Sequence, residues 1–543
     1  MSVAPTPAPR ASAPTASRSG TPAVVLVAVS VLLQVVVGQL GPSVAVPPVT
    51  PDLDRHPLAN GWLVTGLLAA ALTCGGVGLL LGLRALRDGW RPAPRRLLAG
   101  AALGVLVLLI GPPLGTADLG GYAAYGRMSV LHRDPYATTP QDLAGDPVVD
   151  AAEEPWRSIP SIYGPVATVE FRIAAELGGD SRQTVLRLLQ GASGLAFLAT
   201  GFLLDRRTAR VGPEARRRAA LLWSLNPLLL HQLVAGGHLD SLLALLVVAA
   251  VLLAELPFRR AWRGSGGRAG GWWGGGRWGD GYRGSVASGA VFGVAGLVKA
   301  TAAAPAAGVA VALLLDRGRP GDRRAGPPAR TAAFAAAGAV VAALGYTAVG
   351  GLSALTPTRD ASRFVSRGTP WRFVASGLEH VLPHDTARTV VGLLALVAAV
   401  LLAVRISRAL PIAPPAASVS AADPTPDSRI VGIALAASVA WLVLAPYSLP
   451  WYDAIGWALL ALLVVGGPAV VRVETLLLLH TAFLSVAYLP GRVVGLTDGI
   501  TTAQDVVRGL LAPIIVTVVA FGLAWLPRSG TAGGAAVGRT LGG

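Results

Sequence analysis

The residue best placed to do chemistry is Asp118, a lone carboxylate that directly follows an apolar run. Tyr122 and Tyr125 follow it at helical spacing, so the three side chains fall on adjacent turns of one helix face. A carboxylate in this position could act as a general base toward an acceptor hydroxyl, against a donor carried by a lipid. Alternatively, Asp118 only caps the short helix that it begins. Position alone leaves both interpretations open.

The elements that must position this carboxylate are membrane helices. The chain of 543 residues is 53% hydrophobic and 14% charged, with a mean hydropathy of +0.59, whereas about a quarter of the residues of a soluble globular protein are charged. Runs long enough to cross about 30 Å of hydrocarbon predict an all-α polytopic membrane protein with about 13–15 transmembrane helices. These runs lie near residues 23–40, 61–83, 97–115, 185–204, 219–235, 239–256, 286–299, 301–315, 331–350, 389–404, 430–447, 452–470, 473–489 and 508–526.

Arginines assign sides to these runs, because cytoplasmic loops carry an excess of Lys and Arg. All the arginine clusters are cytoplasmic only if 185–204 is the sole span that returns between residues 96 and 205. The run 163–178 is then predicted to be an interfacial helix in the large outer loop 116–184. All 14 runs cross the membrane in this arrangement, and both termini are cytoplasmic. The clusters lie before residue 22, in 84–96, 205–218, 257–285, 316–330 and 405–429, and after residue 526.

The charged and aromatic residues of the spans gather at their predicted outer ends, and the middles are almost free of charge. Ion-coupled transporters place their sites near the midplane on broken helices. The pattern therefore favours a reaction at the outer membrane surface over the alternatives, which are a polytopic transporter or lipid flippase and a non-catalytic membrane scaffold. The predicted outer elements are the loops 116–184, 351–388 and 490–507 and the turns at 236–238, Lys299 and Pro450.

The remaining segments define one transmembrane domain, 23–526, between two disordered cytoplasmic tails, 1–22 and 527–543. The loop 257–285 is rich in Gly, Arg and Trp, and it is predicted to be a flexible basic loop near anionic lipid instead of a nucleic-acid site. The single cysteine, Cys74, excludes a disulfide framework, and none of the seven histidines has metal-ligand spacing with a second His or Cys. No metal is predicted.

Several short motifs resemble one family when they are read in chain order. They are DLGGYAAYGR (118–127), DPY (134–136), YGP (163–165), NPLLLHQLVAGGHLDSLLALL (226–246), GLVKATAAAPA (296–306) and LAPYSLPWY (444–452). Together they resemble the actinobacterial polyprenol-phosphomannose-dependent α-1,6-mannosyltransferases, which are membrane glycosyltransferases of the GT-C type. Leu119 and Leu239 depart from the family pattern, which leaves the sugar and the linkage open.

The resemblance implies a GT-C-like fold and a reaction on the outer face of the plasma membrane. Mannose would pass from polyprenyl-phosphate mannose to a glycan or glycolipid acceptor, as in α-1,6-mannan elongation. Asp118 would deprotonate the acceptor hydroxyl, and the anomeric carbon would be inverted as the polyprenyl phosphate leaves. No cofactor is implied, and the partners are the lipid-linked donor, the acceptor and membrane lipids, without nucleic acid.

The departing phosphate needs positive charge, and Lys299, the only lysine of the chain, is the first candidate. Snorkelling to the lipid headgroups is its alternative role. His238 could bind the phosphate or an acceptor hydroxyl while Asp240 orients its ring, or the two cap a helix. Arg363, Arg367 and Arg372 in the predicted outer loop 351–388 are further phosphate candidates. The predicted sugar- or acceptor-binding residues are Tyr122, Tyr125, Asp134, Tyr136, Tyr163, Asp240, Trp371, Trp451 and Tyr452, although Trp and Tyr also form ordinary interfacial belts.

Overall fold

The computed structural model describes residues 19–48, 60–255, 282–316, 326–411 and 428–527. Most of the two predicted tails and most of the predicted loop 257–285 lie outside these residues, although α1 begins at Thr21, inside the predicted first tail. In the described part of the chain, helices are the only regular elements apart from one isolated bridge between Ser43 and Val46. The predicted all-α class is therefore confirmed.

Each predicted apolar run lies on one helix or on a set of consecutive helices. These are α1 (Thr21–Gln39), α2 (Gly61–Arg87), α3 (Pro94–Ile110), α6 (Arg182–Ala209), α7 (Pro213–Ala219) with η5 (Ala220–Ser224), α8 (Pro227–Leu229) and η6 (Leu230–Ala235), α9 (Asp240–Glu255), α10 (Arg283–Gly296), η7 (Ala300–Ala302) with α11 (Ala303–Leu315), α12 (Pro327–Thr347), α15 (His384–Ala409), α16 (Ser428–Leu444), η9 (Pro450–Asp453) with α17 (Ala454–Leu462), α18 (Pro468–Tyr488), and α19 (Asp498–Val506) with η10 (Val507–Leu511) and α20 (Ala512–Ala524).

Seven helices in the described ranges are long and apolar enough to cross a membrane, or eight if the bent pair 213–235 and 240–255 forms one span. The protein is thus a multi-pass membrane protein. The remaining runs lie on helices of 17 residues or fewer, namely α3, α10, α11, α16 and α17. The prediction of 14 crossings therefore requires that these shorter helices also cross the membrane. They are not among the helices that are long and apolar enough to be identified as spans.

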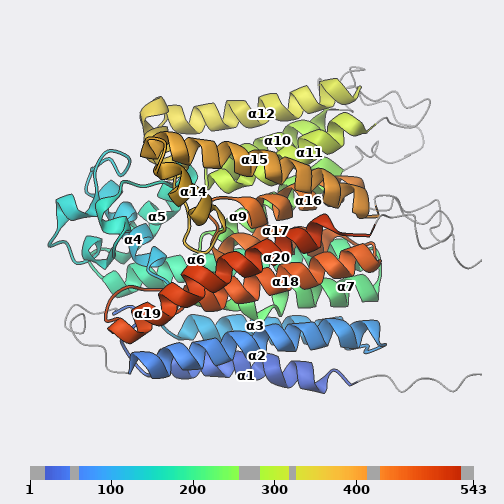
Figure 1. Ribbon diagram of the computed structural model, residues 1–543, viewed down its shortest axis with the longest axis horizontal. Coiled ribbons are helices and arrows are strands. Elements are labelled where there is room, and N and C mark those ends of the chain that lie inside the picture. The colour runs from blue at the N-terminus through green and yellow to red at the C-terminus, as the bar shows by residue number, and fades with distance from the viewer. Residues whose placement is uncertain (1–18, 49–59, 256–281, 317–325, 412–427, 528–543) are drawn as a thin grey trace, which may run out of the picture.

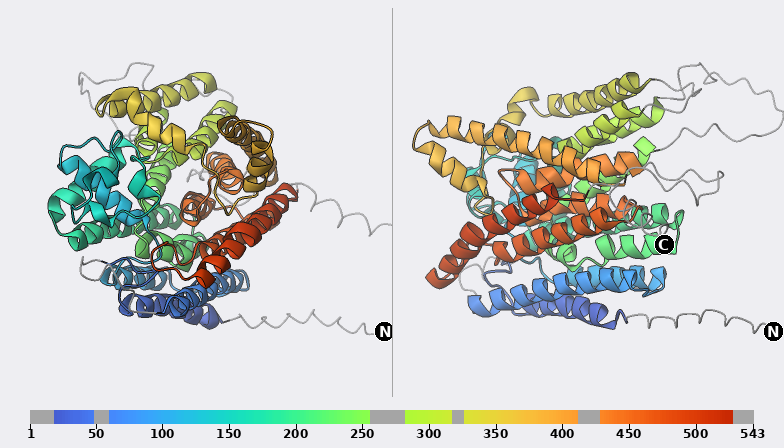
Figure 2. Two further views of the ribbon diagram at one scale, coloured as in Figure 1. Left: turned by 60° about the vertical axis from the view of Figure 1, so that its left-hand side comes forward. Right: turned by 45° about the vertical axis from the view of Figure 1, so that its right-hand side comes forward.

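The helices run roughly side by side between two ends of the molecule (Figure 1). The helices α1, α2 and α3 form one flank, and α12 lies at the opposite flank (Figure 2). The core passes between these flanks, where every residue of α17 is buried. In contrast, α15 exposes a face of leucine and valine, and Leu401 is 67% exposed. Such a face suits contact with lipid.

One end of the molecule carries α4 (Asp118–Val130) and α5 (Pro165–Gly178), which lie together at the left of Figure 1. Val169, Ile173 and Leu177 form an exposed apolar stripe on α5 at intervals of four residues. This stripe is what an interfacial helix requires, since one face packs on protein and the other meets the headgroup region. Further helices of this end are η2 (Pro140–Leu143), η3 (Val149–Ala151), η4 (Trp156–Ser158), η8 (Gly351–Leu355), α13 (Thr356–Ala361) and α14 (Trp371–Glu379), and α19 also reaches it (Figure 1).

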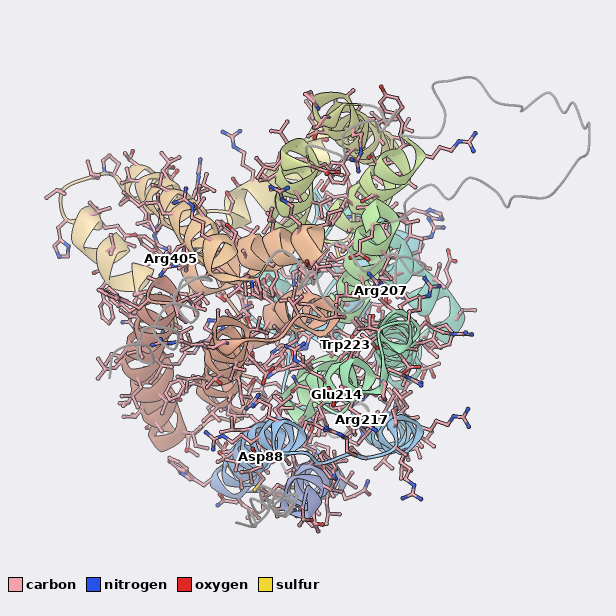
Figure 3. All side chains as sticks on the ribbon, turned by 90° about the vertical axis from the view of Figure 1, so that its right-hand side faces the viewer. Asp88, Arg207, Glu214, Arg217, Trp223 and Arg405 are labelled. Carbon is pink, nitrogen blue, oxygen red and sulfur yellow. The ribbon has the colours of Figure 1, made fainter. Side chains whose placement is uncertain are left out.

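The opposite end carries arginines from two of the clusters that were predicted to be cytoplasmic, 205–218 and 405–429. Figure 3 looks onto this end, and it shows Arg207, Arg217 and Arg405. Arg207 forms an ion pair with Glu255 at 2.6 Å, which joins α6 to α9. Arg207, Arg217 and Arg405 therefore lie at the end of the helical body opposite to α4 and α5.

Candidate active site

Asp118 is the first residue of α4, and it is buried, with 4% of its surface exposed. The N-cap residue is Ala117, whose side chain cannot cap. The backbone N–H of Asp118 donates to Thr116 Oγ1 at 3.0 Å, so the Thr116 hydroxyl accepts from the first backbone N–H of the helix. The carboxylate itself contacts other segments. The capping alternative for Asp118 is therefore not what the geometry shows.

Trp156 holds one oxygen of this carboxylate. Its indole Nε1–H donates to Asp118 Oδ1 at 2.9 Å. The segment that carries Trp156 reaches α4 because Gly120 has no side chain, since a Cβ there would lie 2.0 Å from the carbonyl oxygen of Ala151. The second oxygen, Oδ2, has no hydrogen bond to the described residues and lies 3.8 Å from His238 Nε2. One carboxylate oxygen is thus fixed and the other is left to accept a proton.

His238 is fully buried beside Asp118. Its Nδ1 donates to the carbonyl oxygen of Gln232, which can only accept, so Nδ1 carries the proton. In the neutral ring Nε2 then accepts from Thr116 Oγ1 at 3.1 Å. Thr116 therefore donates to His238 and accepts from the backbone of Asp118, which links the two predicted site residues.

The turn that carries His238 lies between the helical segment 213–235, which ends with η6, and α9, and the two are bent by 119°. Gly237 has φ +66°, a left-handed conformation that favours glycine. A Cβ at Gly237 would also lie 2.9 Å from a side-chain carbon of Leu119. The predicted Gly-Gly turn is therefore explained by backbone conformation and by close packing against α4.

The predicted role of Asp240 in orienting the His238 ring is wrong. Asp240 instead binds Lys299, whose Nζ lies 3.0 Å from Oδ1 and 2.8 Å from Oδ2. Both groups are buried, because Asp240 is 0% and Lys299 9% exposed. A buried ion pair of this kind is not a lysine that snorkels to the headgroups.

Lys299 joins three further parts of the site. Its ammonium lies 3.9 Å from the ring centroid of Tyr452, within cation–π range. The residues just before it, Leu297 and Val298, accept hydrogen bonds from the backbone of Val166 and Gly164. The outer loop thus docks directly onto the turn that carries the lysine.

Trp451 and Tyr452 lie on the turn η9, and Trp451 stacks on His238 with ring centroids 3.8 Å apart. The turn is anchored by the next residue, Asp453, whose Oδ2 lies 2.8 Å from His480 Nδ1 and 2.6 Å from Thr481 Oγ1. Asp453 and His480 are both fully buried. Asp453 stands at the start of the predicted run 452–470, whereas His480 lies inside the run 473–489, whose middle was predicted to be almost free of charge. The pair positions the aromatic turn against His238.

The other predicted sugar-binding residues of the outer loop make internal contacts. Tyr122 stacks on Phe171 and meets the ring of Tyr163 edge to face. The Tyr125 hydroxyl donates to the carbonyl oxygen of Ile159 at 2.9 Å. These contacts hold α4, α5 and the intervening segment together. The remaining two, Asp134 and Tyr136, form a turn in which the Tyr136 N–H donates to Asp134 Oδ1, and the Tyr136 hydroxyl lies 2.8 Å from Thr168 Oγ1.

The structure does not bring Arg363, Arg367 and Trp371 into contact with this cluster. Arg363 pairs with Asp385 at 3.1 Å, and Arg367 pairs with Asp505. The Trp371 Nε1–H donates to the carbonyl oxygen of Leu444 at 2.7 Å, at the end of α16. The predicted cluster therefore reduces to Asp118, His238, Lys299, Asp240, Trp451 and Tyr452.

The environment of Asp118 suits a base. Burial raises the pKa of its carboxyl to about 6, while the charge of Lys299 and the hydrogen bond from Trp156 act in the opposite direction. A carboxylate with a pKa near 6 is ionised at neutral pH and still accepts a proton more readily than an exposed aspartate. In the described part of the chain, no group of His, Cys, Asp and Glu residues could hold a metal ion.

Sequence reasoning missed Thr116, Trp156 and Gln232, although each contacts Asp118 or His238. Thr116 stands two residues before the predicted base, and a hydroxyl so close in sequence could have been predicted to bond near it. Trp156 stands 38 residues after Asp118. Only the folding of the outer loop brings it back, so no local pattern indicates it.

Comparisons with known proteins agree with the motif resemblance. Residues 18–315 match a family model described as alpha-(1→6)-mannopyranosyltransferase, N-terminal domain. Alpha-(1→6)-mannopyranosyltransferase B of Corynebacterium glutamicum is 33% identical over 26% of this chain and 23% of its own length. Alpha-(1→6)-mannopyranosyltransferase A of Mycobacterium tuberculosis is 28% identical over 35% of this chain and 38% of its own length. The matches thus span well under half of either relative.

An archaeal oligosaccharyltransferase from Archaeoglobus fulgidus, solved with an inhibitory peptide and a dolichol-phosphate, is a more distant structural match. It covers 81% of this chain and 56% of its own, at 14% identity and a TM-score of 0.35.

Asp118→Asn is expected to remove a pH dependence of stability. The carboxyl has a pKa of 3.8 when unperturbed and about 6 in the fold. Its stabilising contribution is therefore complete below pH 3.8 and is lost as the pH rises through 6, at a cost of about 3 kcal/mol by pH 7. Thermal unfolding of the purified protein at pH 5 and 7.5 should show a loss of stability in the wild type that Asp118→Asn lacks. The exposed Asp360→Asn is the matched control, and equal pH dependence in all three proteins would contradict the assignment.

Proposed function

Because the chain belongs to the family of alpha-(1→6)-mannopyranosyltransferases, we propose that it transfers mannose from polyprenyl-phosphate mannose to a glycan or glycolipid acceptor. The observation that carries the proposal is the carboxylate of Asp118, with one oxygen held by Trp156 and the other open beside His238. A polytopic transporter has no comparable support, since the family match and this preorganised base both favour a transferase.

In the proposed reaction, Asp118 Oδ2 takes the proton of the acceptor hydroxyl as the acceptor oxygen attacks the anomeric carbon. The new bond joins that oxygen to the anomeric carbon, and the bond between the anomeric carbon and the phosphate oxygen breaks. Attack opposite the leaving group inverts the anomeric carbon. The phosphodiester of the donor carries one negative charge and the departing polyprenyl phosphate carries two, so a cation near the phosphate lowers the barrier.

The residues around Asp118 have supporting roles in this proposal. Trp156 keeps the carboxylate in place, and Thr116 with Gln232 keeps Nε2 of His238 unprotonated toward the site. A sugar hydroxyl would have to replace Thr116 Oγ1 to donate to Nε2 of His238, because that nitrogen already accepts from Thr116. The ammonium of Lys299, paired with Asp240, lies over the ring of Tyr452, and Trp451 stacks on His238.

We place the reaction on the outer face and both termini in the cytoplasm. The support is the separation of charge between the two ends of the molecule. Arg207, Arg217 and Arg405 lie at the end opposite to α4 and belong to clusters that the positive-inside rule assigns to the cytoplasm (Figure 3). Asp118 lies at the start of α4, so it faces the outer side in this orientation.

Asp118→Asn should lower mannose transfer by about 10²- to 10⁴-fold, the usual contribution of a general base. The amide keeps the size of the side chain and the contact with Trp156 but cannot take a proton. The measurement is the rate of transfer from polyprenyl-phosphate mannose to a short mannoside in membranes with matched protein levels. Transfer at the wild-type rate would exclude Asp118 as the base.

Trp156→Phe should shift the pH dependence of transfer upward. The indole hydrogen bond lowers the pKa of Asp118, so losing it raises that pKa above its value of about 6 and requires a higher pH to ionise the base. The rate against pH between 5 and 8 is the measurement. A rate that falls by the same factor at every pH would show that Trp156 acts only on packing.

Lys299→Met should destabilise the protein by about 3–5 kcal/mol, because it leaves Asp240 buried without its partner. The double variant Lys299→Met, Asp240→Asn removes the orphaned charge and should recover most of that stability. If Lys299 also serves the donor, the apparent KM for polyprenyl-phosphate mannose stays raised in the double variant. A double variant with both wild-type stability and wild-type KM would leave Lys299 a structural role only.

A further inference from the structure

The leaving phosphate of the proposed reaction has no free cation at the site described so far. Two hydrogen bonds of the Lys299 ammonium go to the two oxygens of Asp240. When both groups are ionised, the pair has no net charge to offset the second negative charge of the departing phosphate. The inference that follows rests on the proposed function, since it concerns the donor of that reaction.

Most other cations near this end of the molecule are also neutralised by carboxylates. Their partners lie on neighbouring loops and helices, so each pair joins two segments. The pairs are Arg127 with Asp146 and Asp180, Arg157 with Asp150, Arg363 with Asp385, Arg367 with Asp505, Arg388 with Glu379, and Arg492 with Glu153.

Arg508 differs from these residues. It is half-buried on η10 and forms no ion pair with the described residues. Its guanidinium lies 4.6 Å from the ring centroid of Tyr488. Tyr488 meets Trp451 edge to face at 4.9 Å, and Trp451 stacks on His238. A single wall of aromatic rings therefore connects an uncompensated cation to the histidine beside Asp118.

An apolar groove of about 490 Å³ lies between α14, α15, α16 and α20. Trp371 of α14 and Leu444 at the end of α16 line it, and Val516 and Ala520 line it along α20. From Val516 to Ala524 the groove follows α20 for about 12 Å at the rise of an α-helix. Apart from Thr517 and Arg405, its lining residues are apolar, which suits a hydrocarbon chain and not a sugar.

The groove and Arg508 are connected through α14. Trp371 lines the groove, and the next residue, Arg372, donates from Nη1 to the carbonyl oxygen of Gly509 at 2.8 Å. Gly509 directly follows Arg508. The end of the groove at Trp371 is thus tied to the segment that carries Arg508.

We propose that Arg508 binds the phosphate of the lipid-linked donor and that the groove beginning at Trp371 receives its isoprenoid chain. A guanidinium offers a phosphate two parallel N–H donors, and such charge-assisted bonds are among the strongest in proteins. The donor would lie with its sugar toward Asp118 and its chain along α20. Lys299, held by Asp240, then positions Tyr452 and supports the site electrostatically.

Binding of farnesyl phosphate tests the proposal without requiring sugar transfer. Arg508→Gln should weaken farnesyl phosphate about 10- to 100-fold, the equivalent of one charge-assisted hydrogen bond, and should leave the binding of farnesol unchanged. Ala520→Trp, which fills the groove, should weaken both ligands. Arg359→Gln is the matched control, because Arg359 is an exposed arginine of α13 for which the structure gives no ion pair.

Each alternative result contradicts a defined part of the proposal. Wild-type affinity of Arg508→Gln for farnesyl phosphate would overturn the phosphate site, as would an equal loss for farnesol, which points to packing. Equal competition by phosphatidylglycerol would mean that an ordinary bilayer lipid fills the groove. If the wild type binds farnesyl phosphate through Arg508 but transfers no mannose, the proposed function fails and the phosphate site stands. If mannose is transferred and the KM of Arg508→Gln is unchanged, only the Arg508 assignment fails.

Discussion

Burying the ammonium of Lys299 requires a carboxylate beside it, and the site depends on how that requirement is met. Asp240 begins α9 and Lys299 follows α10, so the pair joins the start of one helix to the end of the next, 59 residues along the chain. The outer loop then docks through Gly164 onto the residues before the lysine, and Tyr452 packs against its ammonium. Removing either charge alone leaves the other unpaired in a low-dielectric interior, which costs several kcal/mol. The pair therefore sets the mutual positions of three segments that surround Asp118.

The base is fully oriented before a substrate binds, whereas the site for the leaving phosphate is not. Asp118 has its orientation, its neighbour and its raised pKa in place without a substrate, because Trp156, Thr116 and burial supply them. The cations that could meet a phosphate are mostly occupied by carboxylates. Such pairing is expected where the counter-charge arrives with the substrate, since an unpaired buried cation is costly until then. A half-buried arginine on an aromatic ring avoids that cost, because the ring face attracts the guanidinium while its N–H groups stay available.

The predicted apolar runs and the first-loop carboxylate were available from the sequence because they depend on composition and on local spacing. Each run lies on helices, and Asp118 begins one as predicted. The partner of Asp240 was not available, since proximity to His238 in sequence suggested the wrong contact and the true partner is 59 residues away. Trp156 and Arg508 likewise reach the site only through loop folding and helix packing. The Asp453–His480 pair was missed because the two residues stand in different apolar runs, 27 positions apart. The sequence alone does not show that their side chains face each other.

The arginines that give the chain its net charge of +16 have different roles at the two ends of the molecule. Arg207 and Arg218, at the end away from α4, bind Glu255 and Glu474 and so join neighbouring helices. Arg218 also donates to the carbonyl oxygens of Leu460 and Leu463, which closes the end of the buried helix α17. Arginine suits these positions because its five donors satisfy a carboxylate and a helix terminus together. A lysine has only three donors on one atom. The single site that keeps a lysine is the one where a compact ammonium must fit between a carboxylate and an aromatic ring.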